Sequence, residues 1–433
     1  MNSKEFARRR KQLMRMIGSD GIAICPSAPV RLRSRDAEYR YRQDSDFWYL
    51  TGFGEADSVA VLAPGRDNGE FILFCRERDR EKELWNGTRQ GPDGAVANFG
   101  ADDAFPIDDI DDILPGILES RSRVYYTMGA YPEFDSRMGD WLKSLRGREA
   151  SGVLPPQEFV ALDHLLHDMR LYKSRAELSA MRQAAAIAVA AHKRAMTLVR
   201  PGMFEYQVEA EFLHEFRSRD AVVSYSPIVG SGANACTLHY VENNARLEEG
   251  DLLLIDAGCE YDYYASDITR TLPVSGRYSP EQRAMYEIVL EAQLAAIERT
   301  RKGNHWNDPH DAAVRVITRG LKKLGLLQGT LPKLLRDGAY REFFMHRTGH
   351  WLGMDVHDVG DYRVDDEWRL LESGMVTTVE PGIYIPASRR VPARWRNIGI
   401  RIEDDVAVTN NGPDVLSKGL AKDPDEIETL MAG

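Results

Sequence analysis

Four carboxylates in the second half of the chain stand where a strand would normally carry apolar side chains. Asp256 closes the apolar run Leu-Leu-Leu-Ile, and Asp267 follows in the segment Ser-Asp-Ile-Thr-Arg-Thr. Glu380 ends the run Val-Thr-Thr-Val before Pro-Gly, and Glu403 ends Ile-Gly-Ile-Arg-Ile. Burying an unpaired charge is very costly, so a cluster of such acids requires counter-charges. Two divalent cations would balance all four negative charges.

Histidines concentrate near these acids in the sequence. The segment 344–357 contains His346, His350 and His357, out of 10 histidines in the whole chain. His239 lies further upstream, in the segment Cys-Thr-Leu-His-Tyr. Histidine exchanges protons near neutral pH and is a common metal ligand, so these residues are candidates for metal ligands and proton carriers.

Simpler interpretations exist for each residue taken alone. A lone acid on a strand commonly faces solvent, a lone histidine is commonly structural, and Arg401 can pair with Glu403 on one strand face. One arginine cannot neutralise four buried acids, however. Two like charges opposed in a sheet also destabilise it unless a cation lies between them. The complete set therefore favours a metal site over four unrelated acids.

The elements that must position these residues can be placed from the hydrophobic pattern. Helices are expected to begin at Ser174, where Ser and Glu177 have capping-box spacing, over 205–218, and at Ser279 before Pro. Strands over 251–256 and 265–271 are expected to form a hairpin, which would place Asp256 near Asp267. A domain boundary is expected near Tyr172.

The first part of the chain mixes strand and helix patterns and is therefore expected to be an α/β domain. Residues 1–18 are expected to form a surface helix, because they are amphipathic and lack the apolar core of a secretory signal. Strands are expected over 46–53, 58–63 and 70–75.

Composition excludes several classes of function. The 433 residues carry a formal net charge of −11, which argues against a nucleic-acid-binding protein. No apolar run approaches the roughly 20 residues of a membrane helix, so no membrane association is expected. The 4 cysteines are isolated in the sequence, which suits free thiols and a cytoplasmic location.

The ordered acids and histidine resemble the ligand set of the creatinase-like "pita-bread" metallopeptidases, which include Xaa-Pro aminopeptidase (aminopeptidase P), prolidase and methionine aminopeptidase. The segment 42–53, containing Ser-Asp-Phe-Trp-Tyr-Leu-Thr-Gly-Phe, is similar to the N-terminal domain of aminopeptidase P, and 226–240 is similar to the segment bearing its active-site histidine. Trp85 stands where that family keeps a tryptophan near the substrate channel. Arg347 stands where relatives often have a small residue, so the channel wall beside His346 is expected to differ.

This resemblance implies an N-terminal creatinase-like α/β domain over 1–172, which serves oligomerisation and lines the channel. A pita-bread catalytic domain with a curved antiparallel sheet and flanking helices would follow over 173–433. The implied metal ligands are Asp256, Asp267, His350, Glu380 and Glu403. One imidazole with four carboxylates suits two divalent ions, Mn²⁺ first, with Co²⁺, Zn²⁺ or Mg²⁺ as alternatives.

The resemblance also implies roles for residues around the ligands. His239 and His346 would line a pocket for proline, and His357 would bind the substrate carbonyl or relay a proton. Glu380 would be the base for a metal-bridging hydroxide, while Tyr384 and Arg401 would orient the ligands.

The implied reaction is release of the N-terminal residue from peptides with proline at the second position. Prolidase, which accepts only Xaa-Pro dipeptides, is the alternative enzyme on the same fold, and a non-catalytic pita-bread binding module is a remote one. The implied partners are a peptide substrate and further copies of the chain, as a homodimer or homotetramer.

Overall fold

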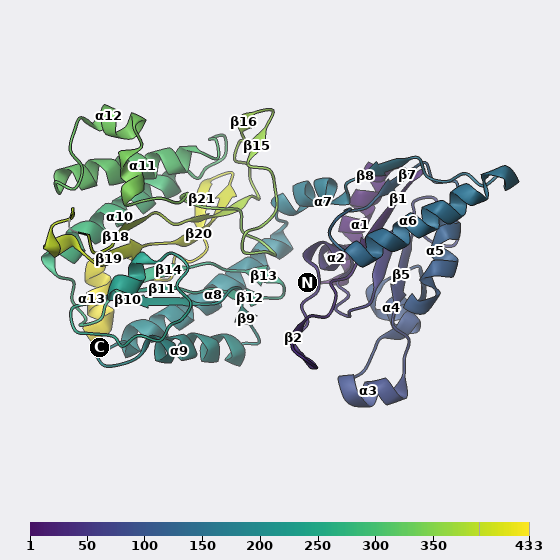
Figure 1. The fold of residues 1–433 in the computed structure, drawn as a ribbon, viewed down its shortest axis with the longest axis horizontal. Coiled ribbons are helices and arrows are strands. Elements are labelled where there is room, and N and C mark those ends of the chain that lie inside the picture. Colours follow the sequence, from purple (N-terminus) through teal and green to yellow (C-terminus); the bar gives the residue numbers. More distant parts are fainter. Residues whose placement is uncertain (389, 433) are drawn as a thin grey trace. The chain divides into compact units, whose positions relative to one another are not determined.

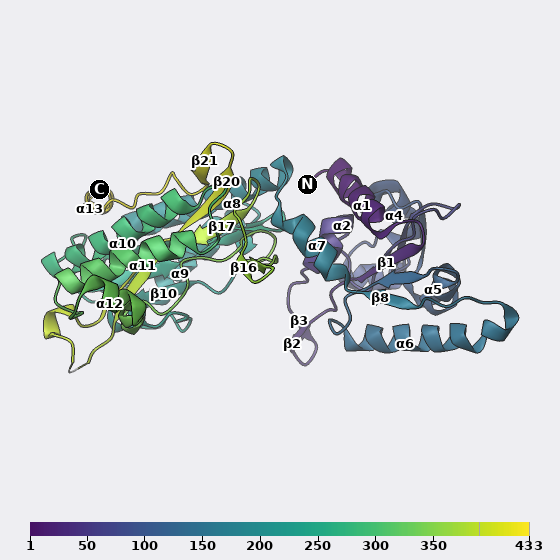
Figure 2. The same ribbon diagram turned by 90° about the horizontal axis from the view of Figure 1, so that it is seen from above.

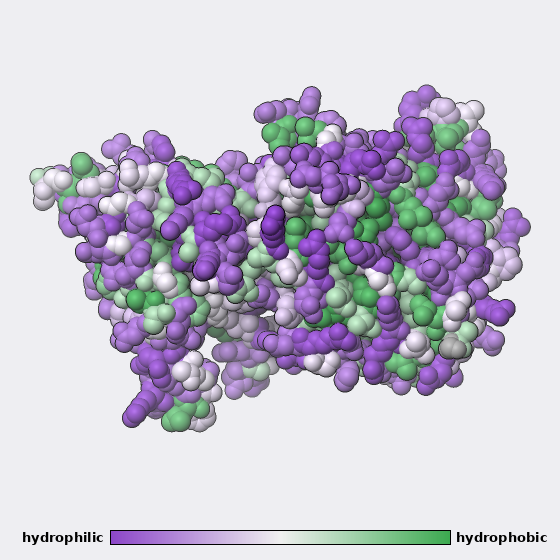
Figure 3. Space-filling view, turned by 180° about the vertical axis from the view of Figure 1, so that it is seen from behind, coloured by the Kyte–Doolittle hydropathy of each residue, from purple (hydrophilic) through white to green (hydrophobic). Residues whose placement is uncertain are grey.

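The computed structural model describes residues 1–388 and 390–432, and the chain divides into two compact units, Met1–Met169 and Arg170–Gly433 (Figure 1). Within the described ranges, no helix combines the length and apolar character needed to cross a bilayer. All four cysteines are free thiols, as their spacing predicts. Hydrophilic side chains cover most of the face drawn in Figure 3, as expected for a chain in which 28% of residues are charged.

The N-terminal unit is built on a mixed six-stranded sheet in the order β6-β5-β4-β1-β7-β8. Figure 2 shows helices on both faces of this sheet, with α5 and α6 on one side and α1 and α4 on the other. The expected α/β architecture is therefore confirmed. The helices are α1 (Ser3–Ile17), α2 (Ser45–Thr51), α3 (Arg80–Asn86), α4 (Gly91–Phe99), α5 (Ile110–Leu118), α6 (Pro132–Gly147) and α7 (Leu162–Leu171), and the strands are β1 (Gly21–Pro26), β2 (Leu32–Ser34), β3 (Ala37–Glu38), β4 (Val59–Leu62), β5 (Phe71–Cys75), β6 (Asp103–Pro106), β7 (Arg123–Tyr125) and β8 (Glu158–Val160).

The strand expected over 46–53 is wrong, because this segment forms helix α2. Its aromatic residues suggested a strand, but local capping decides in favour of the helix. The Asp44 carboxylate accepts a hydrogen bond from the Phe47 amide at the N-terminus, and Gly52 ends the helix with a left-handed backbone. The two other strands expected in this part of the chain are confirmed as β4 and β5.

The C-terminal unit packs its strands between two pairs of helices, α8 with α9 and α10 with α11 (Figure 1). Helix α8 begins with the expected capping box, in which the side chains of Ser174 and Glu177 each accept from the other's backbone amide. The helices are α8 (Arg175–Leu198), α9 (Glu205–Ser218), α10 (Pro280–Arg299), α11 (Asp308–Lys323), α12 (Leu331–Arg336) and α13 (Pro424–Ala432).

The strands of this unit form several short antiparallel sheets, among them β10-β11-β14, β17-β20-β21 and β18-β19. Their apolar faces pack on the helices and form one continuous core with them. The strands are β9 (Val222–Val223), β10 (Ile228–Ser231), β11 (Leu252–Asp256), β12 (Cys259–Tyr261), β13 (Tyr264–Ala265), β14 (Thr269–Pro273), β15 (Arg363–Val364), β16 (Glu367–Trp368), β17 (Val376–Val379), β18 (Gly382–Ile385), β19 (Ile398–Arg401), β20 (Asp404–Thr409) and β21 (Gly412–Val415).

The expected single strand over 265–271 is divided in the structure. Strand β13 ends at Ala265 and β14 begins at Thr269, so Asp267 lies in the connecting segment. Strand β14 does pair antiparallel with β11, with Asp256 opposite Thr269. The interruption turns Asp267 out of the ladder, and its backbone amide instead donates to the Asp405 carboxylate.

A buried ionic network supports the strands that carry the acids. The Arg270 guanidinium donates to the Asp404 carboxylate at 2.7 Å and to the Glu403 carbonyl at 2.6 Å. Asp404 also accepts from Gln293 and Lys422. Although burial opposes it, the charges of Arg270 and Lys422 lower the pKa of Asp404. The network ties β14, β20 and α10 together directly behind Glu403.

We expect Asp404→Asn to destabilise the protein by about 3–5 kcal/mol, because it leaves the buried Arg270 guanidinium without its counter-charge. Thermal unfolding followed by calorimetry measures the change. Asp425→Asn is the matched control: Asp425 pairs with Arg283 at the surface, where an ion pair contributes only about 0–1 kcal/mol. Equal stability of the two variants would show that the network does not support the fold.

Candidate metal centre

The four carboxylates singled out in the sequence lie at the ends of four different segments and line one cavity of about 570 Å³. Asp256 ends β11, Asp267 precedes β14, Glu380 follows β17, and Glu403 lies between β19 and β20. The cavity volume is in the range of ligand-binding sites. Ligand atoms of Asp267, His350 and Glu403 all lie within 4.8 Å of one another, a spacing at which they could hold a metal ion.

Tyr225 connects two of these carboxylates and was not found from the sequence. Its hydroxyl contacts Oδ1 of both Asp256 and Asp267, at 2.6 Å in the second case. Burial and the charge of Asp256 raise the pKa of Tyr225, so the phenol keeps its proton. A single hydroxyl proton can serve only one carboxylate at a time, so the two aspartates are not neutralised by this contact.

The electrostatics of the cluster show that its negative charge is under-compensated. Burial, reinforced by the charges of Asp267 and Glu380, raises the pKa of Glu403 well above its usual value. Burial raises the pKa of Glu380 to about 7, although the charges of His350 and Arg401 oppose this. Like charges buried this close together cannot all ionise unless counter-charges lie among them.

His350 takes the place of a cation within the cluster. Its Nε2 lies 3.4 Å from Asp267 Oδ2 and 3.7 Å from Glu380 Oε1. Although burial opposes it, the hydrogen bond with Asp267 and the charge of Glu380 raise the pKa of His350 to about 9. Its Nδ1 lies 2.9 Å from the Trp351 carbonyl, which fixes the ring and leaves Nε2 facing the acids.

A chain of hydrogen bonds runs from the cluster through Arg401 and Tyr384 to His346. Arg401 donates to Asp256 Oδ2 at 2.6 Å and to the Tyr384 hydroxyl at 2.9 Å. The Tyr384 hydroxyl lies 2.9 Å from His346 Nε2, and His346 Nδ1 lies 2.7 Å from the Arg347 carbonyl. The carbonyl only accepts, so Nδ1 carries the proton and Nε2 accepts from Tyr384.

This arrangement limits what His346 can do. Burial and the charge of Arg401 lower the pKa of His346 to about 3, so the ring is neutral at physiological pH. Both ring nitrogens have neighbouring polar groups, and Nδ1 also lies 3.7 Å from Glu380 Oε2. His346 thus lines the cavity as a neutral ring whose Nδ1 already carries its proton.

His357 and His239 also line the cavity, and neither has a hydrogen-bond partner among the described residues. The His357 ring lies 4.3 Å from that of His350, edge to face. Burial and the charge of His350 lower the pKa of His357, so it is neutral at pH 7. The adjacent Asp358 is held by Arg170 at 2.6 Å and Lys173 at 2.9 Å, which anchors the loop that presents His357.

Further side chains around the cluster orient the acids through hydrogen bonds. The sequence pattern did not reveal these residues. Thr269 donates to Glu403 Oε2 at 2.6 Å, and the Thr378 hydroxyl lies 3.3 Å from Glu380 Oε1. Burial and the charge of Asp267 raise the pKa of Asp405, whose carboxyl accepts the Asp267 amide. Nothing in their types or spacing distinguishes these residues from ordinary strand residues, apart from the position of Asp405 two residues after Glu403.

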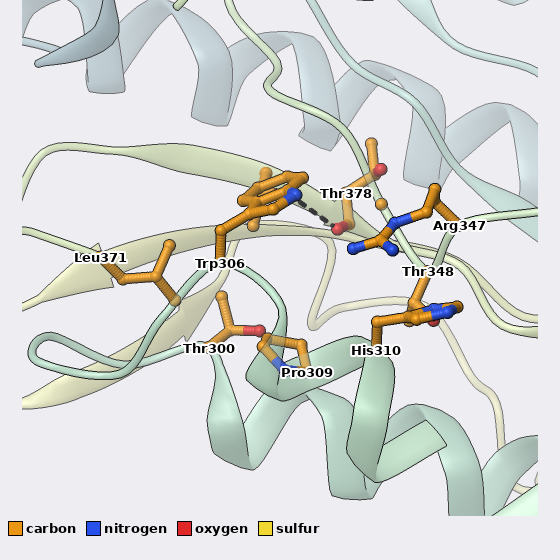
Figure 4. A pocket seen from close by; sticks show the side chains of 10 residues that line it. Thr300, Trp306, Pro309, His310, Arg347, Thr348, Leu371 and Thr378 are labelled. Atoms are coloured by element: carbon orange, nitrogen blue, oxygen red, sulfur yellow. Dashed lines mark hydrogen bonds between the residues drawn. The ribbon is translucent and has the colours of Figure 1, made fainter. Parts of the chain in front are cut away.

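A smaller cavity lies beside the main one and shares Arg347, Trp306 and Gly349 with it (Figure 4). His310, on α11, reaches into it and holds its Nδ1 2.9 Å from the Thr348 hydroxyl. Burial lowers the pKa of His310 to about 4. This histidine, to which the sequence assigned no chemistry, therefore stays neutral and supports the backbone next to His350. Trp85, by contrast, is an exposed residue of α3 in the N-terminal unit.

Comparison with known proteins identifies the family to which the chain belongs. Residues 179–410 match Metallopeptidase family M24, and residues 6–125 match the N-terminal domain of aminopeptidase P. The chain belongs to metallopeptidase family M24, the pita-bread family that the sequence motifs indicated.

The similar proteins and solved structures within this family include several aminopeptidases. The chain is 44% identical to the Xaa-Pro aminopeptidase of Escherichia coli K12, across 100% of this chain and 98% of that protein. It superposes with a TM-score of 0.99 on the aminopeptidase PepP of Pseudomonas aeruginosa, at 59% identity over 100% of this chain and 98% of the other. A zinc-substituted E. coli aminopeptidase P in complex with product gives a TM-score of 0.97 at 44% identity, over 100% of this chain and 98% of the other.

The donor set fits divalent metal ions. Carboxylate oxygens and one imidazole are the ligands that such ions accept, and they converge here on one cavity. Arg401 already pairs with Asp256, and no other arginine of residues 1–388 and 390–432 forms an ion pair with these four carboxylates.

We expect metal binding to release protons, because cations must displace those held by His350, Glu380 and Glu403, whose pKa values are all raised. The difference between pH 6 and pH 8 comes mainly from Glu380: with pKa values of about 9 for His350 and about 7 for Glu380, both hold protons at pH 6, while at pH 8 His350 still does and Glu380 largely does not. Titration of the metal-free protein with Mn²⁺ in buffers of different ionisation enthalpy should therefore show weaker binding and greater proton release at pH 6.

The exposed His214, on α9, provides the control, since His214→Gln should leave both quantities unchanged. Equal proton release at the two pH values would contradict the prediction that His350 and Glu380 hold these protons before the metal binds.

Proposed function

We propose that this chain is a metal-dependent aminopeptidase that releases the N-terminal residue from peptides with proline in the second position. The observation that carries the proposal is the convergence of four buried carboxylates and His350 on one cavity. Its membership of a metallopeptidase family and its full-length similarity to named Xaa-Pro aminopeptidases support the same reaction.

The proposed cofactor is a pair of divalent ions, with Mn²⁺ first and Co²⁺, Zn²⁺ or Mg²⁺ as alternatives. Asp256, Asp267, His350, Glu380 and Glu403 would hold these ions. When bound, such ions act as Lewis acids and ionise water near neutral pH.

The proposed base is Glu380. Its carboxylate lines the cavity beside His350, where a carboxylate can both accept and return a proton. The Thr378 hydroxyl, 3.3 Å from Oε1, restrains one of its oxygens and leaves the other for this role. Arg401 and Tyr384 hold Asp256 and His346 in place.

The proposed role of the histidines follows from the leaving group. The nitrogen of a proline imide has no hydrogen, so it must receive a proton before it departs as an amine. His357 and His239 face the cavity with ring nitrogens that no described residue occupies, and they are the candidates to bind the carbonyl or relay this proton. His346 would line the proline pocket.

Prolidase activity is the alternative on the same fold, and the length of the substrate separates the two. The N-terminal aminopeptidase P domain and the relatives above favour longer peptides. We expect the Mn²⁺-loaded protein to cleave Xaa-Pro-Xaa peptides at least about tenfold faster than Xaa-Pro dipeptides, as measured by mass spectrometry of the products. A preference for dipeptides would identify a prolidase, and no cleavage of either would favour a non-catalytic binding module.

We further propose that the chain works as a homodimer or homotetramer in the cytoplasm, with the N-terminal domain, over 1–172, serving in assembly and in lining the substrate channel. Leu84 and Trp85, adjacent on α3, are 86% and 84% exposed, an unusual state for large apolar side chains. Burial of this pair against another copy of the chain would remove that exposure. Sedimentation equilibrium tests the proposed assembly through the mass in solution.

We expect Glu403→Gln to lose metal loading and activity together, because it keeps the shape of the side chain and removes its charge. The fall in kcat/KM should exceed the roughly 10–100-fold effect of removing partners outside the ligand set. Elemental analysis and a peptide assay measure the two losses, with Glu287→Gln, an exposed acid on α10, as the control. Wild-type turnover by the variant after metal stripping would refute the proposed ligand.

A further inference from the structure

Arg347 brings a positive charge to the wall of the main cavity. The described residues that line this cavity include only two guanidinium groups, those of Arg347 and Arg401. Arg401 is committed to Asp256, Tyr384 and Thr269. Arg347 forms no ion pair with any described carboxylate, and the charge of Asp311 acts on it without direct contact, so its N–H groups on the cavity side are available to a ligand.

Neighbouring side chains hold the Arg347 guanidinium in place without neutralising it. Its Nη2 donates to Asn307 Oδ1, just before α11, and its Cζ lies 4.9 Å from the centre of the Trp368 ring. Figure 4 shows Arg347 and Trp306 reaching toward the space between them from opposite sides. Because a guanidinium has five N–H donors, several remain for a planar acceptor such as a carboxylate.

The charge balance of the cavity favours an anionic group on the ligand once metal ions are bound. Its lining residues carry four carboxylates and two guanidiniums. Two divalent cations would offset the carboxylates, which leaves the guanidiniums in excess. Such a focused positive charge attracts a negative group and discriminates against neutral ones.

We propose that Arg347 is a specificity-determining residue that binds a carboxylate of the peptide substrate on the C-terminal side of proline. This inference rests on the proposed function, which requires the peptide's N-terminus and scissile bond to lie at the acid cluster. The remainder of the peptide then extends along the other lining residues, among them Trp306, Tyr362, Trp368 and Arg347. The carboxylate is either the C-terminus of a short peptide or the side chain of an acidic residue after proline.

Three peptides test this with the Mn²⁺-loaded full chain: Ala-Pro-Ala with a free carboxylate, the same peptide as its amide, and Ala-Pro-Glu amide. For wild type we expect at least one of the two carboxylate peptides to have a KM about tenfold below that of Ala-Pro-Ala amide, with similar kcat. Preference for the free C-terminus alone assigns the main-chain carboxylate, and preference for the glutamate peptide alone assigns a side chain.

In Arg347→Met the ratio of KM values should fall to about one, and Arg347→Lys should retain part of it, because lysine keeps the charge but not the planar fork. Arg341→Gln is the matched control, since Arg341 stacks on Tyr340 and does not line the cavity. The wild-type preference should also weaken as ionic strength rises, a measurement that needs no variant.

The inference is overturned if wild type does not distinguish the carboxylate peptides from the amide, if Arg347→Met keeps the preference, or if salt leaves it unchanged. Failure of wild type to cleave any of the three peptides would instead overturn the proposed function. The two failures are therefore distinguishable in one set of assays.

Discussion

The burial of like charges is the constraint on which the rest of this structure depends. Asp256, Asp267, Glu380 and Glu403 converge from separate segments. Among the described residues, the Arg401 guanidinium and the imidazoles of His350 and His346 lie 2.6–3.7 Å from their carboxylate oxygens. Ion pairing within the protein alone does not satisfy the whole set. The raised pKa values of Glu380 and Glu403 and the raised pKa of His350 are two aspects of the same deficit of positive charge. Divalent cations remove that deficit and supply the chemistry of a peptidase.

The fold supports the cluster from behind with ionic and hydrogen-bonded contacts. Arg270 and Asp404 fix the strands next to Glu403, while Asp358, held by Arg170 and Lys173, fixes the loop next to His357. The apolar faces of the same strands pack on α8 to α11, so that each strand has a core side and a site side. The acids can therefore be held close together at positions that a free chain would avoid. This rigidity is what allows metal binding to use a preformed site.

Much of the architecture could be predicted from local sequence signals. The capping box at Ser174, the Ser-Pro start at Ser279 and the apolar run before Asp256 each correspond to an element of the structure. The segment 46–53 was misassigned because aromatic residues favour strands in general, while the Asp44 cap and Gly52 determine the helix locally. Residues 265–271 were misassigned because alternation alone cannot reveal that the Asp267 amide bonds to Asp405, a residue far away in the chain.

The site residues likewise fall into those that the sequence reveals and those that only the folded structure reveals. Charged residues within apolar runs are conspicuous, so the acids and the histidines of 344–357 could be found from their types and spacing. Tyr225, Thr269 and Thr378 act through contacts made only in the folded chain, and their types are ordinary for strands and loops. The free guanidinium of Arg347 likewise becomes apparent only when its neighbours are known. Anomalous scattering from crystals grown with Mn²⁺ tests the central claim most directly. Two peaks among the four carboxylates, one of them beside His350, are predicted; an absence of peaks there, with ordered side chains, would contradict it.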